Sequence, residues 1–77
     1  MDHGSGMMTQ EEMAKLESAT GAEFDKQWLT LMIKHHQGAV TMAEQVLTTT
    51  EDDAVERMAK AIVKAQKAEI KAMQREL

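Results

Sequence analysis

Two adjacent histidines, His35 and His36, lie between methionines in the central part of the chain. Met32 lies one helical turn before both of them, and Met42 lies two turns after His35 along the same side of a helix. Imidazole nitrogen binds copper, zinc and nickel, whereas thioether sulfur is soft and selects Cu(I) over zinc. Because the chain contains no cysteine, two imidazoles and two thioethers on one surface predict a copper site at which Cu(I) is favoured.

Further candidates lie in an amphipathic segment near the carboxyl end. Gln66, Glu69 and Met73 fall within its apolar stripe, where polar groups are costly unless they are paired. We expect Gln66 and Glu69, together with Asp25 upstream, to hydrogen-bond around the His–Met cluster, as groups behind metal ligands do. Met73 would add a sulfur ligand. Core packing explains Met42 or Met73 equally well when each is considered alone.

Residues 1–8 contain two glycines and a serine, which is typical of a flexible arm. His3 is third from the amino end, so the free amine, two amide nitrogens and its imidazole could form a square-planar site for Cu(II) or Ni(II). That site requires Met1 to be the true and unblocked terminus. His3 could instead join Met7 and Met8 in a mobile metal-capturing arm, and a plain disordered tail is the third alternative.

The composition favours helices throughout the chain. Proline is absent, and Ala, Met, Glu, Lys and Gln, which are strong helix formers, are frequent. Thr9 and Glu12 have the spacing of a capping box that starts a first helix, and Gly21 would end that helix. Thr50 or Asp52 can cap the last helix. Helices are expected over residues 9–19, 22–48 and 53–76, within a single all-α domain over residues 9–77.

A helical wheel of residues 22–48 shows a broad apolar stripe centred on Met32. His36 lies within this stripe, toward the expected bundle centre, whereas His35 and Met42 lie together on its flank. We therefore expect His35 and Met42 to capture an arriving ion, and His36 to be either a deeper ligand or a structural core residue. The other members of the stripe are Asp25, Trp28, Leu29, Ala39, Ala43, Val46 and Leu47.

The two long helices cannot bury their apolar stripes against each other and the short first helix alone. Each would be ~38 Å long, and the first helix is too short to cover both. The simplest solution is a homodimer in which two hairpins form a four-helix bundle. Met13 and Met58 are assigned to packing.

Several classes of protein are disfavoured by the sequence. The net charge is −4 and the basic residues form no patch, so we expect no nucleic-acid partner. No apolar run approaches the ~18 residues of a membrane span. We expect no signal peptide within this sequence, which could still be the mature part of an exported protein. Neither histidine follows a glutamate by three residues, as a ferritin-type di-iron site requires. We expect no enzyme, because a copper-dependent redox activity would need an open coordination position and a cleft, and the sequence shows neither.

The main alternative to metal binding is a structural or interaction module. The histidines would then form a hydrogen-bonded layer with Asp25, Gln66 and Glu69 in the core of a homodimeric bundle. In that case, removing the histidines would lower stability in the absence of metal, and copper would leave the melting temperature unchanged.

A longer motif surrounds the histidines. The run Met32-Ile33-Lys34-His35-His36-Gln37-Gly38-Ala39-Val40 follows Glu23-Phe24-Asp25 and Trp28-Leu29, and it precedes Met42-Ala43. With the later positions Ala59, Ile62, Gln66, Glu69-Ile70 and Met73, this motif resembles the secreted bacterial family catalogued as domain of unknown function 305. The resemblance covers about residues 21–77.

That resemblance implies a ferritin-like bundle built from helix-pair repeats, and one repeat in this chain fits a dimer that completes the bundle. Family members are typically exported, so it implies a periplasmic or secreted protein, and some members are associated with copper binding and copper resistance. Lys34 stands where many members have proline, which removes a helix kink and places a positive charge beside the metal. By position, the implied ligands are His35, His36, Met32, Met42 and Met73.

Overall fold

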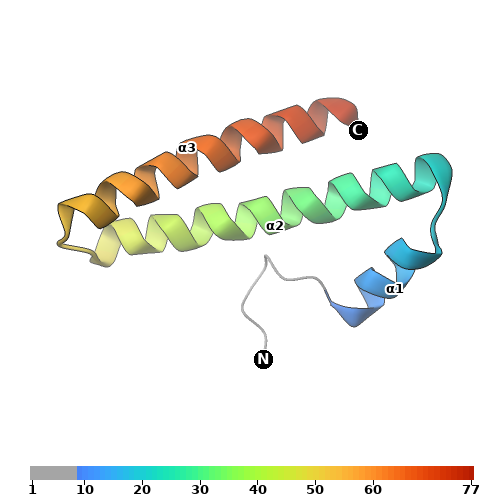
Figure 1. Cartoon of the computed structure of the whole chain (residues 1–77), viewed down its shortest axis with the longest axis horizontal. Coiled ribbons are helices and arrows are strands. Elements are labelled where there is room, and N and C mark those ends of the chain that lie inside the picture. The colour runs from blue at the N-terminus through green and yellow to red at the C-terminus, as the bar shows by residue number, and fades with distance from the viewer. Residues whose placement is uncertain (1–8) are drawn as a thin grey trace.

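The computed structural model describes residues 9–77. These residues form three helices and no strand, and a short helix is followed by a long two-helix hairpin, as predicted (Figure 1). None of the helices described is long and apolar enough to span a membrane. The predicted arm lies outside the described residues. The helices are α1 Gln10–Ser18, α2 Gly21–Thr49 and α3 Asp53–Glu76.

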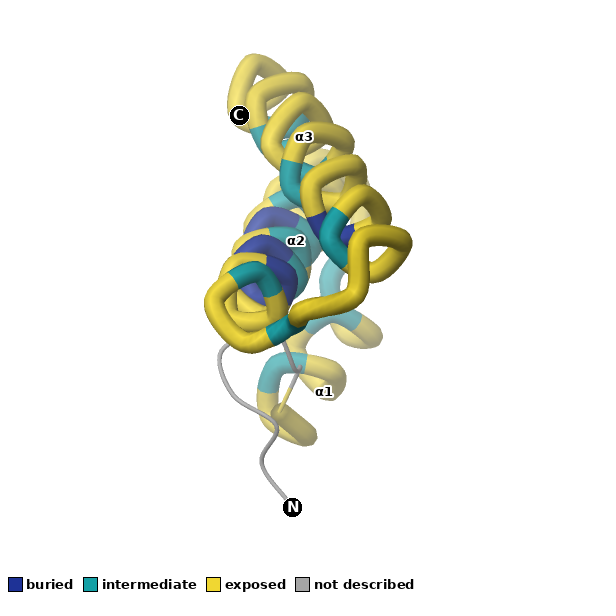
Figure 2. Tube along the Cα trace, turned by 90° about the vertical axis from the view of Figure 1, so that its left-hand side faces the viewer, coloured by how far each residue is buried: buried dark blue, intermediate teal, exposed yellow. Residues whose placement is uncertain are grey.

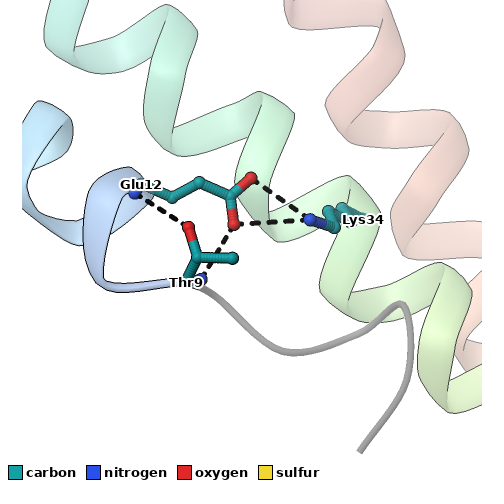
Figure 3. Close-up of polar contacts among 3 residues, drawn as sticks. All are labelled: Thr9, Glu12 and Lys34. Atoms are coloured by element: carbon teal, nitrogen blue, oxygen red, sulfur yellow. Dashed lines mark hydrogen bonds and ion pairs between the residues drawn. The ribbon is translucent and has the colours of Figure 1, made fainter. Parts of the chain in front are cut away.

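α1 begins with the capping box that the sequence predicted (Figure 3). The Thr9 hydroxyl accepts a hydrogen bond from the Glu12 amide at 3.0 Å, and the Glu12 carboxylate accepts one from the Thr9 amide at 2.9 Å. Nζ of Lys34 in α2 donates to both oxygens of the same carboxylate, at 3.2 and 3.3 Å. The Thr9 amide and the Lys34 ammonium hold the pKa of Glu12 below its usual value. Lys34 therefore links α2 to α1. Its positive charge, which was expected beside the metal, is partly neutralised by Glu12.

This contact predicts a pH-dependent docking of α1. A carboxylate whose pKa is lowered by folding stabilises the folded form above its unfolded pKa, and that contribution is lost as the pH falls through the lowered value. We expect the amide NMR resonances of α1 to move toward random-coil values as the pH falls from about 6 to about 3. Glu12→Gln should show weaker docking already at neutral pH, with less further change on acidification.

The control for that experiment is Glu11→Gln, which removes a charge from the same turn without touching Lys34. It should keep the wild-type pH profile. Wild-type α1 resonances that stay unchanged down to the lowest pH would contradict the role assigned to Glu12.

Gly21 was expected to end α1, but it is the first residue of α2. Its φ is +59°, a conformation that only glycine adopts at little cost. α1 ends before it, with Ala19 as the C-cap residue whose amide donates to the Leu16 carbonyl. The glycine therefore lies where the chain turns from α1 into α2.

A short turn over residues 50–52 reverses the chain between α2 and α3. The Thr50 hydroxyl accepts a hydrogen bond from the Asp52 amide at 3.1 Å, and the Asp52 carboxylate accepts one from the Val55 amide at 3.0 Å. Asp52 is thus the N-cap of α3, where a carboxylate also interacts favourably with the helix dipole. α3 then runs back antiparallel to α2 (Figure 1).

The three helices lie side by side in one layer, with α2 between α1 and α3 (Figures 1 and 2). The molecule measures 46 × 31 × 13 Å, and its smallest dimension is close to the ~10–12 Å diameter of one helix with its side chains. No side chain in residues 9–77 is fully buried. The residues with the least exposure are Leu31, Ile33, Gly38, Val40 and Ala43 of α2 and Ala59 of α3.

The apolar stripe of α2 is covered unevenly, which corrects the sequence-based expectation: its member Ala43 is only 6% exposed. Ile33, outside the predicted stripe, is 8% exposed, whereas Trp28 and Val46 inside it are 41% and 39% exposed. Trp28 and Val46 share one side of the stripe, and neither α1 nor α3 covers that side. The assignment of Met13 and Met58 to packing is wrong within this chain, since they are 44% and 65% exposed.

Candidate metal centre

His36 is held in one orientation by its own helix. Its Nδ1 lies 2.7 Å from the carbonyl oxygen of Met32, one turn earlier in α2. A carbonyl oxygen can only accept a hydrogen bond, so Nδ1 carries a proton and donates it. In a neutral ring, the other nitrogen, Nε2, then carries the lone pair. Histidines that bind metals usually have such a hydrogen bond on the nitrogen that does not face the metal.

The Nε2 atom of His36 faces a carboxylate from the neighbouring helix. Glu69 Oε1 of α3 lies 3.3 Å away, and 13% of the His36 side chain is exposed, against 57% of that of Glu69. When the ring is protonated, Nε2 donates to the carboxylate and an ion pair forms. When the ring is neutral, two electron-rich atoms face each other and repel unless a cation binds to both. The pair can therefore hold either a proton or a metal ion.

The spacing of these two atoms suits a metal ion. Bonds from a metal such as zinc to nitrogen or oxygen are about 2.0–2.2 Å long, so two ligands of a tetrahedral ion lie ~3.4 Å apart. The observed separation of Nε2 and Oε1 is 3.3 Å. An ion bound by both atoms would thus require little movement of α2 or α3.

Three further side chains flank the pair. Met32 precedes His36 by one turn, Gln66 and Met73 lie one turn on either side of Glu69, and all three are partly buried. Gln66 Oε1 is buried and has no hydrogen-bond partner among residues 9–77. An unpaired buried oxygen is costly, and a cation or a hydrogen-bond donor beside it would remove that cost. The groups around His36 thus offer nitrogen, oxygen and thioether sulfur.

His35 lies on the exposed side of the same helical turn. Its ring centroid is 6.2 Å from that of His36, and the two ring planes are inclined by 75°. His36 is the more buried of the two, as the helical wheel predicted. His35 therefore borders the His36–Glu69 pair on the side where an arriving ion would meet it first.

Met42 is too far from His35 to share an ion with it in one chain. Seven residues of helix separate the two by ~10 Å along the axis, whereas metals bind nitrogen and sulfur at ~2.0–2.3 Å. Met42 is 62% exposed and belongs instead to a shallow groove of about 370 Å³ between α2 and α3. The groove is lined by apolar residues alone: Ala39, Met42, Ala43, Val46, Val55, Met58, Ala59 and Ile62.

The part of the chain that the structure describes contains no group of three or more His, Asp and Glu side chains able to hold a metal ion. A site at His36 and Glu69 would therefore need a thioether as its next ligand, or a ligand from another chain. Met32 and Met73 are the nearest thioethers along the two helices.

Two of the predicted participants are not placed at this pair. Asp25 was expected to pair with the cluster, but it lies ~16 Å from His36 along α2. It lines a hollow near the end of α3, together with Phe24, Trp28, Leu29 and Glu76. His3 belongs to the residues that the structure does not describe.

Sequence reasoning identified Glu69 as a partner of the cluster but missed two contacts. The group of Met32 that touches His36 is its main-chain carbonyl, which the four-residue spacing could have indicated as readily as it indicated the sulfur. The Lys34–Glu12 ion pair joins residues 22 positions apart. No local pattern shows which carboxylate of α1 would reach Lys34.

Comparison with known protein families agrees with the resemblance seen in the sequence. No curated protein and no solved structure matches this chain. One family model matches it, over residues 1–77, and its description is a domain of unknown function, DUF305. The helical hairpin with its His-His-Gln-Gly stretch therefore belongs to a member of the DUF305 family.

Proposed function

We propose that this protein is an extracytoplasmic copper-binding protein that sequesters or transfers copper. The observation that supports this most strongly is the His36–Glu69 pair, in which Nδ1 is hydrogen-bonded to the Met32 carbonyl and Nε2 lies 3.3 Å from the carboxylate. The pair is oriented to take a cation, and it joins the two long helices at that point. Thioethers lie one turn away on each helix.

Copper is the metal that these donors favour. Imidazole suits copper, and the thioethers of Met32 and Met73 select Cu(I). Calcium needs six to eight oxygen ligands, and magnesium usually keeps several waters bound beside carboxylates. A structural zinc site usually has four ligands drawn from Cys and His, and this chain has no cysteine. Cu(I) is therefore preferred, while the Glu69 oxygen would also suit Cu(II).

Sequestration or transfer suits the position of the site better than catalysis does. Glu69 is 57% exposed and His35 is exposed beside it, so an ion could pass to solvent or to a partner without a channel. The extracytoplasmic location is proposed from the resemblance to a family whose members are typically exported. We propose no enzymatic activity.

Titration with Cu(I) against a chromogenic chelator under reducing conditions tests this function. The wild-type protein should take Cu(I) from the chelator. His36→Ala should weaken binding by about tenfold or more, since even the loss of a group behind a metal ligand costs 10–100-fold. The double variant His35→Ala/His36→Ala should abolish binding at this site.

Gln37→Ala is the matched control, because Gln37 is the exposed next residue of α2 and offers no soft donor. It should bind Cu(I) as the wild type does. Unchanged binding in the double histidine variant would show that the proposed site is wrong.

A second candidate function is a structural or interaction module. The same 3.3 Å contact favours it when Nε2 is protonated, because His36 and Glu69 then link α2 to α3 as an ion pair. This function predicts that His36→Ala lowers the melting temperature without metal. Exposed ion pairs contribute only ~0–1 kcal/mol, and Glu69 is 57% exposed, which is why we prefer copper binding.

A homodimer is part of the proposal, with two hairpins forming a four-helix bundle. The support for it is the 13 Å thickness of the molecule and the exposed side of the apolar stripe of α2, where Trp28 and Val46 are 41% and 39% exposed. A layer one helix thick has no second layer against which to bury that stripe.

A further inference from the structure

One face of the α2–α3 hairpin is apolar and uncovered. Its large side chains fall within about 60° of one another on each helical wheel, and the groove around Met42 joins them across the two helices. Exposed apolar side chains grouped in this way mark an interaction site in a soluble protein. This surface, the open face, has 38–65% exposure at Phe24, Trp28, Met42, Val46, Val55, Met58 and Ile62.

The opposite face of the hairpin is charged. Lys67 of α3 pairs there with Glu44 of α2 at 3.8 Å, and Lys60 pairs with Glu56 one turn earlier at 3.3 Å. Lys64 and Lys71 are also exposed. Only the open face therefore has the composition of a buried surface.

Two groups of the candidate metal centre, His35 and Glu69, lie along the middle of the open face. Going along α2, His35 lies between Trp28 and Met42 on the same side of the helix. On α3, the exposed Glu69 follows Ile62 by two turns on the same side. A partner that covered the apolar ends of this face would also cover the His36–Glu69 pair.

The open face is large enough to hold two copies together. α3 has 24 residues and is therefore ~36 Å long, and two packed helices are ~18 Å wide. These dimensions give roughly 650 Å² per copy and roughly 1,300 Å² in total, within the range of specific interfaces. Both ends of the face are apolar, so a two-fold axis through its middle would place apolar ends on apolar ends.

We infer that a second copy of this chain covers the open face and that each copper site is shared, with His36 and Glu69 from one copy and Met42 of the partner subunit. This inference rests on the proposed function. It also explains how Met42, which lies ~9 Å from His36 along its own helix, takes part in the site.

The position of the two-fold axis supports this arrangement. Glu76, at the end of α3, lies with Phe24 and Leu29 of α2, and α2 ends at Thr49, so the paired part of α2 is centred near residues 37–39. In an antiparallel pair, each residue is level with one that lies equally far on the other side of the axis. His36 is then level with residues 38–42 of the other copy, a stretch that includes the partner's Met42.

Mixing two defective variants tests the shared site. His35→Ala/His36→Ala keeps the thioether but has no imidazole, and Met42→Leu keeps both imidazoles and the apolar surface. Each variant alone should bind Cu(I) about tenfold more weakly than wild type, or worse. After the two are unfolded and refolded together in equal amounts, half of the dimers contain one copy of each, and each of these has one complete site. Tight binding should reappear at about one ion per four chains.

Three outcomes bear on this inference separately from the proposed function. Tight wild-type binding without recovery in the mixture overturns the shared site and leaves copper binding in place. Wild-type affinity in Met42→Leu alone removes Met42 from the site, and Met58→Leu, another methionine of the groove, is the matched control that should bind normally. Absence of Cu(I) binding by the wild type overturns the proposed function and the shared site together.

Sedimentation without metal tests the covering copy independently. The wild type should sediment as a dimer at micromolar concentration, and Met58→Glu should sediment as a monomer because it places a charge on the open face. Ala68→Glu adds the same charge on the side of α3 that faces away from α2, and it should remain a dimer. A monomeric wild type would overturn the inference, as would a Met58→Glu variant that dimerises as tightly as wild type.

Discussion

Excess Cu(I) should raise the melting temperature of the wild-type protein by about 10 °C or more. A ligand that binds only the native state stabilises it by ~2.7 kcal/mol at about 100 times its Kd, and each kcal/mol moves the melting temperature of a domain this small by about 4–8 °C. His36→Ala lacks the nitrogen that faces Glu69, so it should show a clearly smaller rise, at most about half that of the wild type, since tenfold weaker binding removes about half of this stabilisation. Circular dichroism melts under reducing conditions measure both proteins.

Two further variants locate the ion that causes the shift. Gln37→Ala should retain the full copper-dependent rise. His3→Ala tests the arm, and it should also retain the rise if the ion binds between α2 and α3. If His3→Ala lost the copper-dependent rise in melting temperature while His36→Ala kept it in full, the ion would bind at the arm. That result would contradict the role of the His36–Glu69 pair.

A metal at this position would affect stability more than it would in a protein with a deep core. The hairpin is one helix thick, and none of its described side chains is fully buried. α2 and α3 are held together by a narrow strip of contacts around Val40, Ala43 and Ala59. An ion bound by His36 of α2 and Glu69 of α3 adds a link between them at the opposite end of that strip. The copper-dependent rise in melting temperature therefore depends on the His36–Glu69 contact, which is the proposed site.

The helix ends could be predicted from the sequence because short spacings determine them. Thr9 and Glu12 are three residues apart, and the capping box that this spacing predicted is present. Asp52 was one of two predicted caps for α3, and its carboxylate binds the Val55 amide. The other candidate, Thr50, binds the Asp52 amide instead, so both predicted groups act within the same turn.

The coverage of the apolar stripe could not be predicted in the same way. A helical wheel shows which residues share a side of α2, but it does not show which neighbour covers that side. Ile33, outside the stripe, is 8% exposed, whereas Trp28, inside it, is 41% exposed. The course of α1 depends on the positive φ of Gly21, which determines where the Lys34–Glu12 contact can form.

Only part of the metal centre could be predicted, because a helical wheel gives the side of the helix on which a residue lies but not its distance from another residue along the axis. The wheel showed which histidine is more buried, since that depends on the face of one helix. It also suggested that His35 and Met42 act together, because they share a side of α2. Distance along the axis separates them by ~10 Å, which a helical wheel does not show.

Ile33→Ala should lower the free energy of unfolding by about 2–5 kcal/mol, the usual cost of truncating a buried isoleucine. Ile33 is 8% exposed, among the lowest values for a large side chain in residues 9–77. Small domains have only about 5–15 kcal/mol of stability in total, so the melting temperature should fall by about 10 °C or more. Urea unfolding followed by circular dichroism measures the change.

Ile62→Ala is the matched comparison, because the same side chain is 43% exposed on the open face. At protein concentrations where the chain is monomeric, its truncation removes less buried area and should cost about half as much or less. If a second copy covers the open face, Ile62 becomes buried in the dimer, and the cost of Ile62→Ala should rise toward that of Ile33→Ala as the protein concentration increases. A cost for Ile62→Ala that stays small across the concentration range would show that the open face has no covering copy, whereas the Ile33→Ala result would stand in either case.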